Sequence, residues 1–336
     1  MCSSDLSTIQ DCNDPEAWPL ARIATSIAAE EPDLIVFTGD FFYREVACPD
    51  DKTSECGGSP APLPGMPFKD SANGWSVDVF TPMSPVLRTA PILLARGNHE
   101  QCNRGGNGYF IYMDPRTGTE NECAPFVGAD GSLKVRDSNL QPSYYADVQV
   151  AAKRNLRIVV VDSASPEDCT ITVQVPRERV LFEQAQEMAR DHESWLLIHR
   201  PIVGWQPNDD CGPDGGWISA DVTLASKGLL SEYQTIVSSH IHLAQAVNIP
   251  GIPGHIIVGN GGSLLEDATF PVPAYGPDFP GVSYGAPTSA WQEIRFGYTI
   301  ATPGSGMDWV MHMKDPGGVT YAECTLAAKR ITCVDS

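Results

Sequence analysis

The sequence predicts an α/β protein made of two packed mixed β-sheets flanked by helices. Through most of the chain, short apolar runs that end in polar residues alternate with helical patterns. From about residue 255 onward the pieces are shorter and strand-like, which indicates antiparallel hairpins. No linker-like segment interrupts the 336 residues. We therefore expect one domain over residues 1–336, in which residues 255–336 are mainly antiparallel strands of the second sheet.

A helix and a strand are the first elements that the pattern predicts. Over residues 20–30, two isoleucines lie four positions apart among good helix formers, and Pro32 ends the run. Residues 34–37 then form a continuous apolar run, as in a strand buried on both faces. Because Gly39 and Asp40 follow this run directly, we expect Asp40 at the carboxyl end of a strand.

The same order of apolar run and polar end recurs at residues 91–100, 156–162, 195–199 and 235–240. A helical pattern over residues 177–191 separates two of these runs. In open α/β sheets the ligand site lies outside the carboxyl ends of the strands. The polar residues that end the runs are therefore expected to meet at one edge.

Charge and hydropathy exclude some partners. The formal net charge is −20, from 42 acidic and 22 basic residues, which argues against a polyanion such as nucleic acid. No stretch reaches the roughly 18 apolar residues that a membrane span requires. No protein partner is evident from the sequence.

Ten cysteines, mostly in loops and not in CxxC pairs, indicate disulfides and an extracellular or periplasmic location. The N-terminal residues lack the pattern of a signal peptide, so we expect a processed, engineered or truncated start. Sequence alone does not fix the connectivity. The pairs expected from proximity are Cys324 with Cys333, Cys48 with Cys56, Cys102 with Cys123, and Cys169 with Cys211.

Four polar clusters at the ends of apolar runs carry the chemistry. Each is weak in isolation, because a strand-end Asp often caps a turn and Gly-Asn-His often forms one. Together they offer carboxylate, amide and imidazole ligands, which suit a pair of metal ions. Two such ions roughly 3.5–4 Å apart hydrolyse phosphate esters through a bridging hydroxide. The clusters are Gly39-Asp40-Phe41-Phe42-Tyr43, Gly97-Asn98-His99-Glu100, His199-Arg200-Pro201 and Ser239-His240-Ile241-His242.

The order of these clusters resembles the calcineurin-like metallophosphoesterase superfamily over residues 33 to about 262. Tyr43, three residues after Asp40, is similar to the GDxxY motif of purple acid phosphatases, whose tyrosine binds ferric iron. The alternative for Tyr43, a packed aromatic beside Phe41 and Phe42, stays open. His240 and His242 alternate with Ile241, so in an extended segment they would face the same side.

The resemblance implies two metal ions, iron with iron, zinc or manganese, and a role for each residue. Asp40 would bridge the ions. His99 would contact the phosphoryl group or protonate the leaving oxygen, and Glu100 would orient His99. One ion would be held by Asn98, His199 and His240, and the other by Tyr43 and His242.

The chain departs from the family pattern in two places. Ser239 stands where the family usually has glycine. The family also opens with a strand whose aspartate binds the ion on the Tyr43 side, whereas Asp5 and Asp11 follow no apolar run. We therefore expect that the first N-terminal strand is missing, that the natural protein begins earlier, and that one ion has lost a ligand.

The activity that these residues predict is metal-dependent hydrolysis of phosphate esters, with a small phosphomonoester as the substrate. One alternative is a phosphodiesterase of the same superfamily that uses manganese or zinc without a tyrosinate. A further alternative is a catalytically impaired metal-binding domain, because the first aspartate is absent.

Overall fold

The structure, a computed structural model, describes residues 9–56, 69–119, 122–124, 126–127, 133–134, 140–172, 174–206, 216–267 and 271–336. The α-helices in these ranges are α1 (Leu20–Ala29), α2 (Thr53–Cys56), α3 (Ala72–Trp75), α4 (Gly106–Tyr112), α5 (Val175–Ala189) and α6 (Ala220–Ser226). The short strand pairs are β3 (Phe126–Val127) with β4 (Leu133–Lys134), β8 (Trp205–Gln206) with β9 (Gly216–Trp217), and β13 (Asp278–Phe279) with β14 (Val282–Ser283).

A seven-stranded mixed sheet forms the centre of the fold. Its strands in spatial order are β15 (Ser289–Glu293), β11 (Ala244–Asn248), β12 (Gly254–Val258), β10 (Tyr233–Ser238), β7 (Glu193–Ile198), β6 (Arg154–Val161) and β5 (Tyr144–Ala151). Strands β6, β7, β10 and β12 run parallel, and β5, β11 and β15 pair antiparallel with their neighbours. The parallel strands are apolar because both of their faces are covered.

A second layer of strands packs on one face of this sheet. It contains the antiparallel strands β16 (Tyr298–Pro303), β17 (Trp309–Lys314), β18 (Thr320–Ala327) and β19 (Arg330–Asp335) and the parallel pair β1 (Ile35–Phe37) and β2 (Ile92–Leu94). One apolar core joins the layers, with Leu197 and Ile256 from the large sheet and Leu93, Met311 and Leu326 from the second layer.

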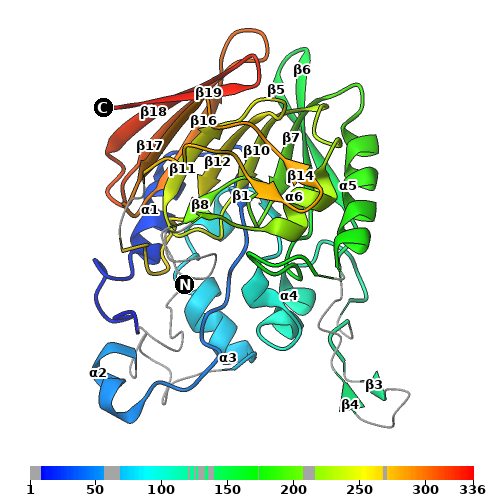
Figure 1. Cartoon of the computed structure of the whole chain (residues 1–336). Helices are drawn as coiled ribbons and strands as arrows, with labels where there is room; N and C mark the ends of the chain where they lie inside the picture. Colours follow the sequence, from blue (N-terminus) through cyan, green and yellow to red (C-terminus); the bar gives the residue numbers. More distant parts are fainter. Residues whose placement is uncertain are drawn as a thin grey trace.

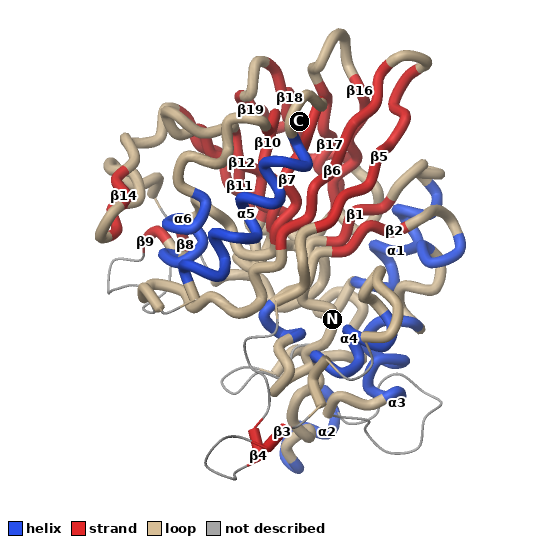
Figure 2. The backbone as a smooth tube through the Cα atoms, turned by 90° about the vertical axis from the view of Figure 1, so that its right-hand side faces the viewer, coloured by secondary structure: helices blue, strands red, loops and turns tan. Residues whose placement is uncertain are grey.

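Helices cover the outer faces. Phe182 of α5 and Val222 of α6 pack against Leu196 and Ile236 of the large sheet, while Leu20 of α1 belongs to the core beside β1. The red C-terminal strands lie along the large sheet in Figure 1, with α5 on its opposite side. Figure 2 shows the strands of the large sheet and of the second layer in the upper part of the molecule, with α2, α3, α4 and the short strands β3 and β4 below them. The predicted pair of sheets flanked by helices is confirmed.

Residues 255–336 contribute the four antiparallel strands of the second layer, but not all strands in this range belong to that layer. Strand β12 forms the expected antiparallel hairpin with β11, but it also pairs parallel with β10 inside the large sheet. Residues 291–299 are divided between β15 in the large sheet and β16 in the second. The reason is burial: β12 is covered on both faces like the other central strands. The second sheet's antiparallel strands therefore begin at Tyr298.

Three of the four predicted disulfides are present: Cys48–Cys56, Cys102–Cys123 and Cys324–Cys333. Cys169 is also disulfide-bonded, but its predicted partner Cys211 lies outside the described residues. None of the described cysteines is free. Among the described helices, none has both the length and the apolar character needed to cross a membrane.

Candidate metal centre

Two glycines let the chain turn sharply at the ends of β1 and β2. Gly39 has φ of 102°, and a Cβ on it would lie 2.6 Å from His199 Nδ1. A Cβ on Gly97 would lie 2.1 Å from Asp40 Oδ1. Side chains at either position would push the two loops apart, so the glycines of both motifs are explained by close approach.

Asp40 and His240 both have a left-handed backbone, with φ of 58° and 71°. This conformation is unfavourable for residues other than glycine and is concentrated at functional sites. Both residues lie just beyond a strand, Asp40 after β1 and His240 after β10. His240 is therefore not in the extended conformation assumed for the alternating histidines, although His240 and His242 line one small cavity with Asp40.

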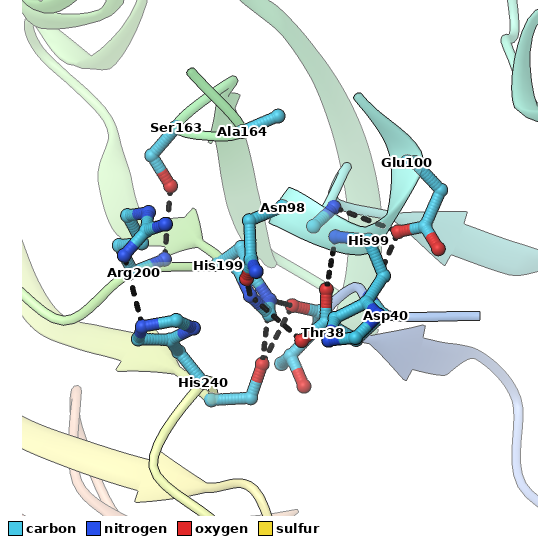
Figure 3. A network of polar contacts seen from close by, with 12 residues as sticks. Thr38, Asp40, Asn98, His99, Glu100, Ser163, Ala164, His199, Arg200 and His240 are labelled. Atoms are coloured by element: carbon cyan, nitrogen blue, oxygen red, sulfur yellow. Dashed lines mark hydrogen bonds and ion pairs between the residues drawn. The ribbon is translucent and has the colours of Figure 1, made fainter. Parts of the chain in front are cut away.

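Asp40, Asn98, His199 and His240 bring their donor atoms together (Figure 3). His199 Nε2 lies 3.1 Å from Asp40 Oδ2 and 2.9 Å from Asn98 Oδ1. Ligand atoms of Asp40, His199 and His240 all lie within 4.8 Å of one another. His199 Nδ1 donates to the carbonyl oxygen of Thr38 at 2.8 Å, so Nε2 is the nitrogen that faces this cluster.

Tyr43 and His242 lie on the other side of Asp40. The Tyr43 hydroxyl donates to Asp40 Oδ2 at 3.1 Å and lies 3.0 Å from His242 Nε2. Burial and the Asp40 carboxylate raise the pKa of Tyr43 well above its usual range. Burial lowers the pKa of His242 to about 4, so its ring is neutral at pH 7, which is the form that binds metals. Asp40 thus touches both groups of donors.

His99 is buried beside Asp40, and its backbone N–H donates to Asp40 Oδ1 at 3.0 Å. Glu45 Oε1 and Arg104 Nη2 each lie 2.7 Å from His99 Nδ1. The expectation that Glu100 orients His99 is wrong, because Glu45 is the carboxylate in contact with the ring.

Glu100 instead binds the backbone of the neighbouring loop. One oxygen accepts from the N–H groups of Phe41 and Phe42 at 2.7 and 3.0 Å. The other accepts from those of Asp40 and Gly97 at 2.9 and 3.0 Å. This fully buried carboxylate therefore fixes the turn that presents Asp40.

Asp168 is a site residue that sequence reasoning missed. It forms an ion pair with Arg200 Nη1, and its Oδ2 lies 3.0 Å from His240 Nε2. Burial opposes ionisation of Asp168, but His240 and Arg200 outweigh it and hold the pKa of its carboxyl well below the usual range. Asp168 comes six residues after the end of the 156–162 run, so no strand-end pattern marks it. Asp162, at the end itself, pairs with buried Arg96 instead.

Among the described residues, the two groups of donors are unequal in size. Asp40, Asn98, His199 and His240 lie together on one side, whereas Asp40, Tyr43 and His242 lie together on the other. Asp11 accepts from the backbone of Asn13 in its own turn, and Asp5 lies outside the described residues.

The fold and the site together define an α/β protein with mixed nitrogen and oxygen donors of the kind that bind transition metals. Residues 6–244 match the family model for calcineurin-like phosphoesterases, and the chain belongs to that family. No protein with curated annotation matches significantly.

Solved structures share the fold at low identity. A purple acid phosphatase, PPD1, from seeds of yellow lupin (Lupinus luteus) matches with a TM-score of 0.51 and 13% identity, over 95% of this chain and 50% of the lupin chain. PhoD matches with a TM-score of 0.51 and 11% identity, over 94% and 69%. GAP50, described as the anchor in the inner membrane complex of Plasmodium, matches at 0.50 and 11%, over 92% and 85%. This chain thus spans about half the length of the lupin protein.

Proposed function

We propose that this chain hydrolyses phosphate esters, preferentially phosphomonoesters, at a centre of two metal ions. The observation that carries the proposal is the convergence of donor atoms from four separate strand ends on Asp40. When bound, the ions would supply a hydroxide nucleophile and offset the negative charge of the phosphoryl oxygens.

Each side of the centre has its own residues. Asp40 would be a ligand of both ions, and its two groups of neighbours would hold one ion each. Asn98, His199 and His240 would hold the first ion, for which iron, zinc or manganese fits their neutral oxygen and nitrogen donors. Tyr43 and His242 would hold the second, where an anionic phenolate would favour iron. Because this second side has fewer donors, its ion should bind more loosely.

His99 is the proposed catalytic residue. Its ring packs against that of Tyr43 at a tilt of 31°, with 3.8 Å between the ring centres, and it contacts Glu45 and Arg104. From this position it would contact the phosphoryl group or donate a proton to the leaving oxygen. The substrate is a small molecule, and the disulfides support an extracellular or periplasmic location.

Metal analysis combined with two aryl esters tests the proposal. The protein is loaded first with iron and then with a second metal, which is iron, zinc or manganese. It should bind up to two ions per chain. It should also hydrolyse the monoester p-nitrophenyl phosphate faster than the diester bis(p-nitrophenyl) phosphate. Activity should rise as metal is added, because the Tyr43 side has only three described donors. Tight metal binding with no hydrolysis of either ester would refute the proposed activity.

The Tyr43→Phe variant tests the tyrosinate. The wild-type iron protein should be violet from charge transfer between the phenolate and iron, and the variant should lose that visible band. The ring itself remains, so its packing on His99 should survive. A colourless wild-type protein that prefers the diester would favour the manganese or zinc phosphodiesterase.

An impaired metal-binding domain is the second candidate. The small number of described donors on the Tyr43 side favours this second candidate. One protein that shares the fold, GAP50, is described as an anchor. Retained metal without turnover is the result that would select this candidate over an enzyme.

A further inference from the structure

A polar cleft of about 380 Å³ lies beside the candidate metal centre, and Asn98 forms part of both. Its volume is that of a small-molecule binding pocket. The residues that line it are Asn98, Gln101, Asn103, Arg104, Ser165, Pro166, Glu167, Gln174 and Arg200. None of these is aromatic, so within the described part of the chain nothing in the lining would stack on an aryl group or a nucleobase.

Two arginines contribute cations to this lining, and each is held in place by a carboxylate. Asp168 pairs with Nη1 of Arg200, while Glu45 Oε1 lies 2.6 Å from Nε of Arg104. Each carboxylate occupies only part of a five-donor guanidinium. Both arginines are therefore oriented in advance, with further N–H groups to offer an anion.

Buried polar atoms in the lining also lack partners. Arg200 is 5% exposed and Ser165 is 9% exposed. Among the described residues, Arg200 Nε and Ser165 Oγ make no hydrogen bond. A buried donor without a partner is costly. Because Arg200 and Ser165 both line the cleft, a bound ligand that carries acceptors would offset this cost.

The other side chains in the lining suit hydroxyl groups. Gln101, Asn103 and Gln174 offer amides that both donate and accept, and Glu167 accepts only. A purely anionic ligand such as a polyphosphate would be repelled by Glu167, whereas a ligand with hydroxyls could donate to it.

We propose that this cleft binds the leaving group of the substrate, and that the leaving group is a small hydroxylated carbon skeleton bearing a second acidic group, which Arg104 and Arg200 hold. This inference rests on the proposed phosphomonoesterase function and narrows its substrate class. Phosphorylated hydroxy acids and acidic sugar phosphates have this chemistry.

Two phosphate esters that differ only at one carbon test the inference. In 3-phosphoglycerate a carboxylate stands where glycerol 3-phosphate has a hydroxymethyl group. We expect kcat/KM of the metal-loaded protein to be about tenfold higher for 3-phosphoglycerate, the range of a charge-assisted hydrogen bond. The ratio of the two kcat/KM values is unaffected by a change in the hydrolysis step, because both esters undergo the same step.

Variants assign the preference to the arginines. Arg104→Gln and Arg200→Gln should each reduce the ratio towards one, even where overall activity falls through their contacts with His99 and His240. Arg88→Gln removes the same charge from an exposed position outside the cleft and should keep the wild-type ratio. A wild-type ratio of one or less, or a ratio that both cleft variants retain, overturns the inference.

Calorimetry with metal-free protein separates this inference from the proposed function. Without metal, 3-phosphoglycerate should still bind about tenfold more tightly than glycerol 3-phosphate, and Arg104→Gln should remove the difference. If neither ester is hydrolysed but this difference in binding is found, the inference about the ligand of the cleft is supported and the phosphatase proposal fails. Equal binding of the two esters overturns the inference about the cleft.

Discussion

Asp40 is the residue that connects the two groups of donors, and its backbone limits what can replace it. At φ of 58° asparagine is among the best-tolerated substitutes, so Asp40→Asn removes the charge with little strain. We expect this variant to keep the fold, to lose bound metal, and to lose about a hundredfold or more in hydrolysis, since changes to residues that merely support metal ligands typically cost ~10–100-fold. Metal analysis, circular dichroism and an aryl phosphate assay check these outcomes.

Asp33→Asn is the matched control for that variant. Asp33 is exposed and lies before the same strand, so the charge change is equal and the metal centre is untouched. If Asp40→Asn bound metal and turned over substrate as the control does, a centre bridged by Asp40 would be ruled out.

The strand-end pattern located Asp40, Asn98, His199 and His240, because parallel strands bring their carboxyl ends to one edge. Their roles as metal ligands remain predictions. Glu45 and Asp168 could not be found in this way, since both lie in loops whose course is set by tertiary contacts and not by a periodic pattern. His255, which lies outside the four clusters, is fully buried.

The Glu100 carboxylate joins the turns after β1 and β2, because it accepts hydrogen bonds from backbone N–H groups of both. Glu100→Gln replaces one acceptor oxygen with an NH₂ group that faces backbone N–H donors. We expect a loss of about 1–3 kcal/mol in the free energy of unfolding, the cost of leaving buried donors unpaired. Urea denaturation in the presence of a chelator measures this loss without a contribution from metal.

Glu183→Gln, an exposed position on α5, serves as the control and should change stability little. We also expect Glu100→Gln to weaken metal binding, because the turn that presents Asp40 would loosen. Wild-type stability together with wild-type metal affinity in Glu100→Gln would contradict the role assigned to this carboxylate.

Single elements were predictable where an apolar run was long and bounded, as in α1, β6 and α5. Sheet membership was not predictable from the same signals. Strand β12 reads locally as one arm of a hairpin, and only its burial on both faces places it beside β10. Which sheet receives β15 depends on its pairing with β11, which no local pattern encodes.

The disulfides act on the stability of the whole molecule, and the size of the closed loop sets the expected effect. Cys102 and Cys123 are 21 residues apart, and Cys324 and Cys333 are 9 apart. Replacing Cys102 and Cys123 by serine should cost about 3 kcal/mol, and replacing the other pair should cost less, because a shorter loop restricts the unfolded chain less. Denaturant unfolding of the two double variants measures the difference, and the reverse order would contradict the argument.

Acid should destabilise the fold through His255. Burial lowers the pKa of this histidine to about 3 from its ordinary value of 6.5. Below 6.5 the unfolded chain binds a proton that the folded protein does not take up until about pH 3, so stability falls across that window as the pH drops. The full effect is bounded by about 5 kcal/mol, at about 1.4 kcal/mol per pKa unit.

His255→Gln should flatten this pH dependence, measured as the free energy of unfolding of metal-free protein at pH 7 and at pH 4.5. His192→Gln, which changes an exposed histidine, should retain the wild-type dependence. An unchanged slope in His255→Gln would show that other groups govern acid unfolding.

The distance along the chain between the donors has a consequence for folding kinetics. The contact between Tyr43 and His242 joins residues 199 positions apart, and that between Asn98 and His199 joins residues 101 apart. Closing such loops costs entropy before any contact compensates for it, so these pairs should meet late on the folding pathway. A metal that binds only the completed centre would then leave the refolding rate almost unchanged and slow unfolding instead. Bound ions would therefore stabilise the native state kinetically. Removing them would raise the unfolding rate and leave the refolding rate almost unchanged.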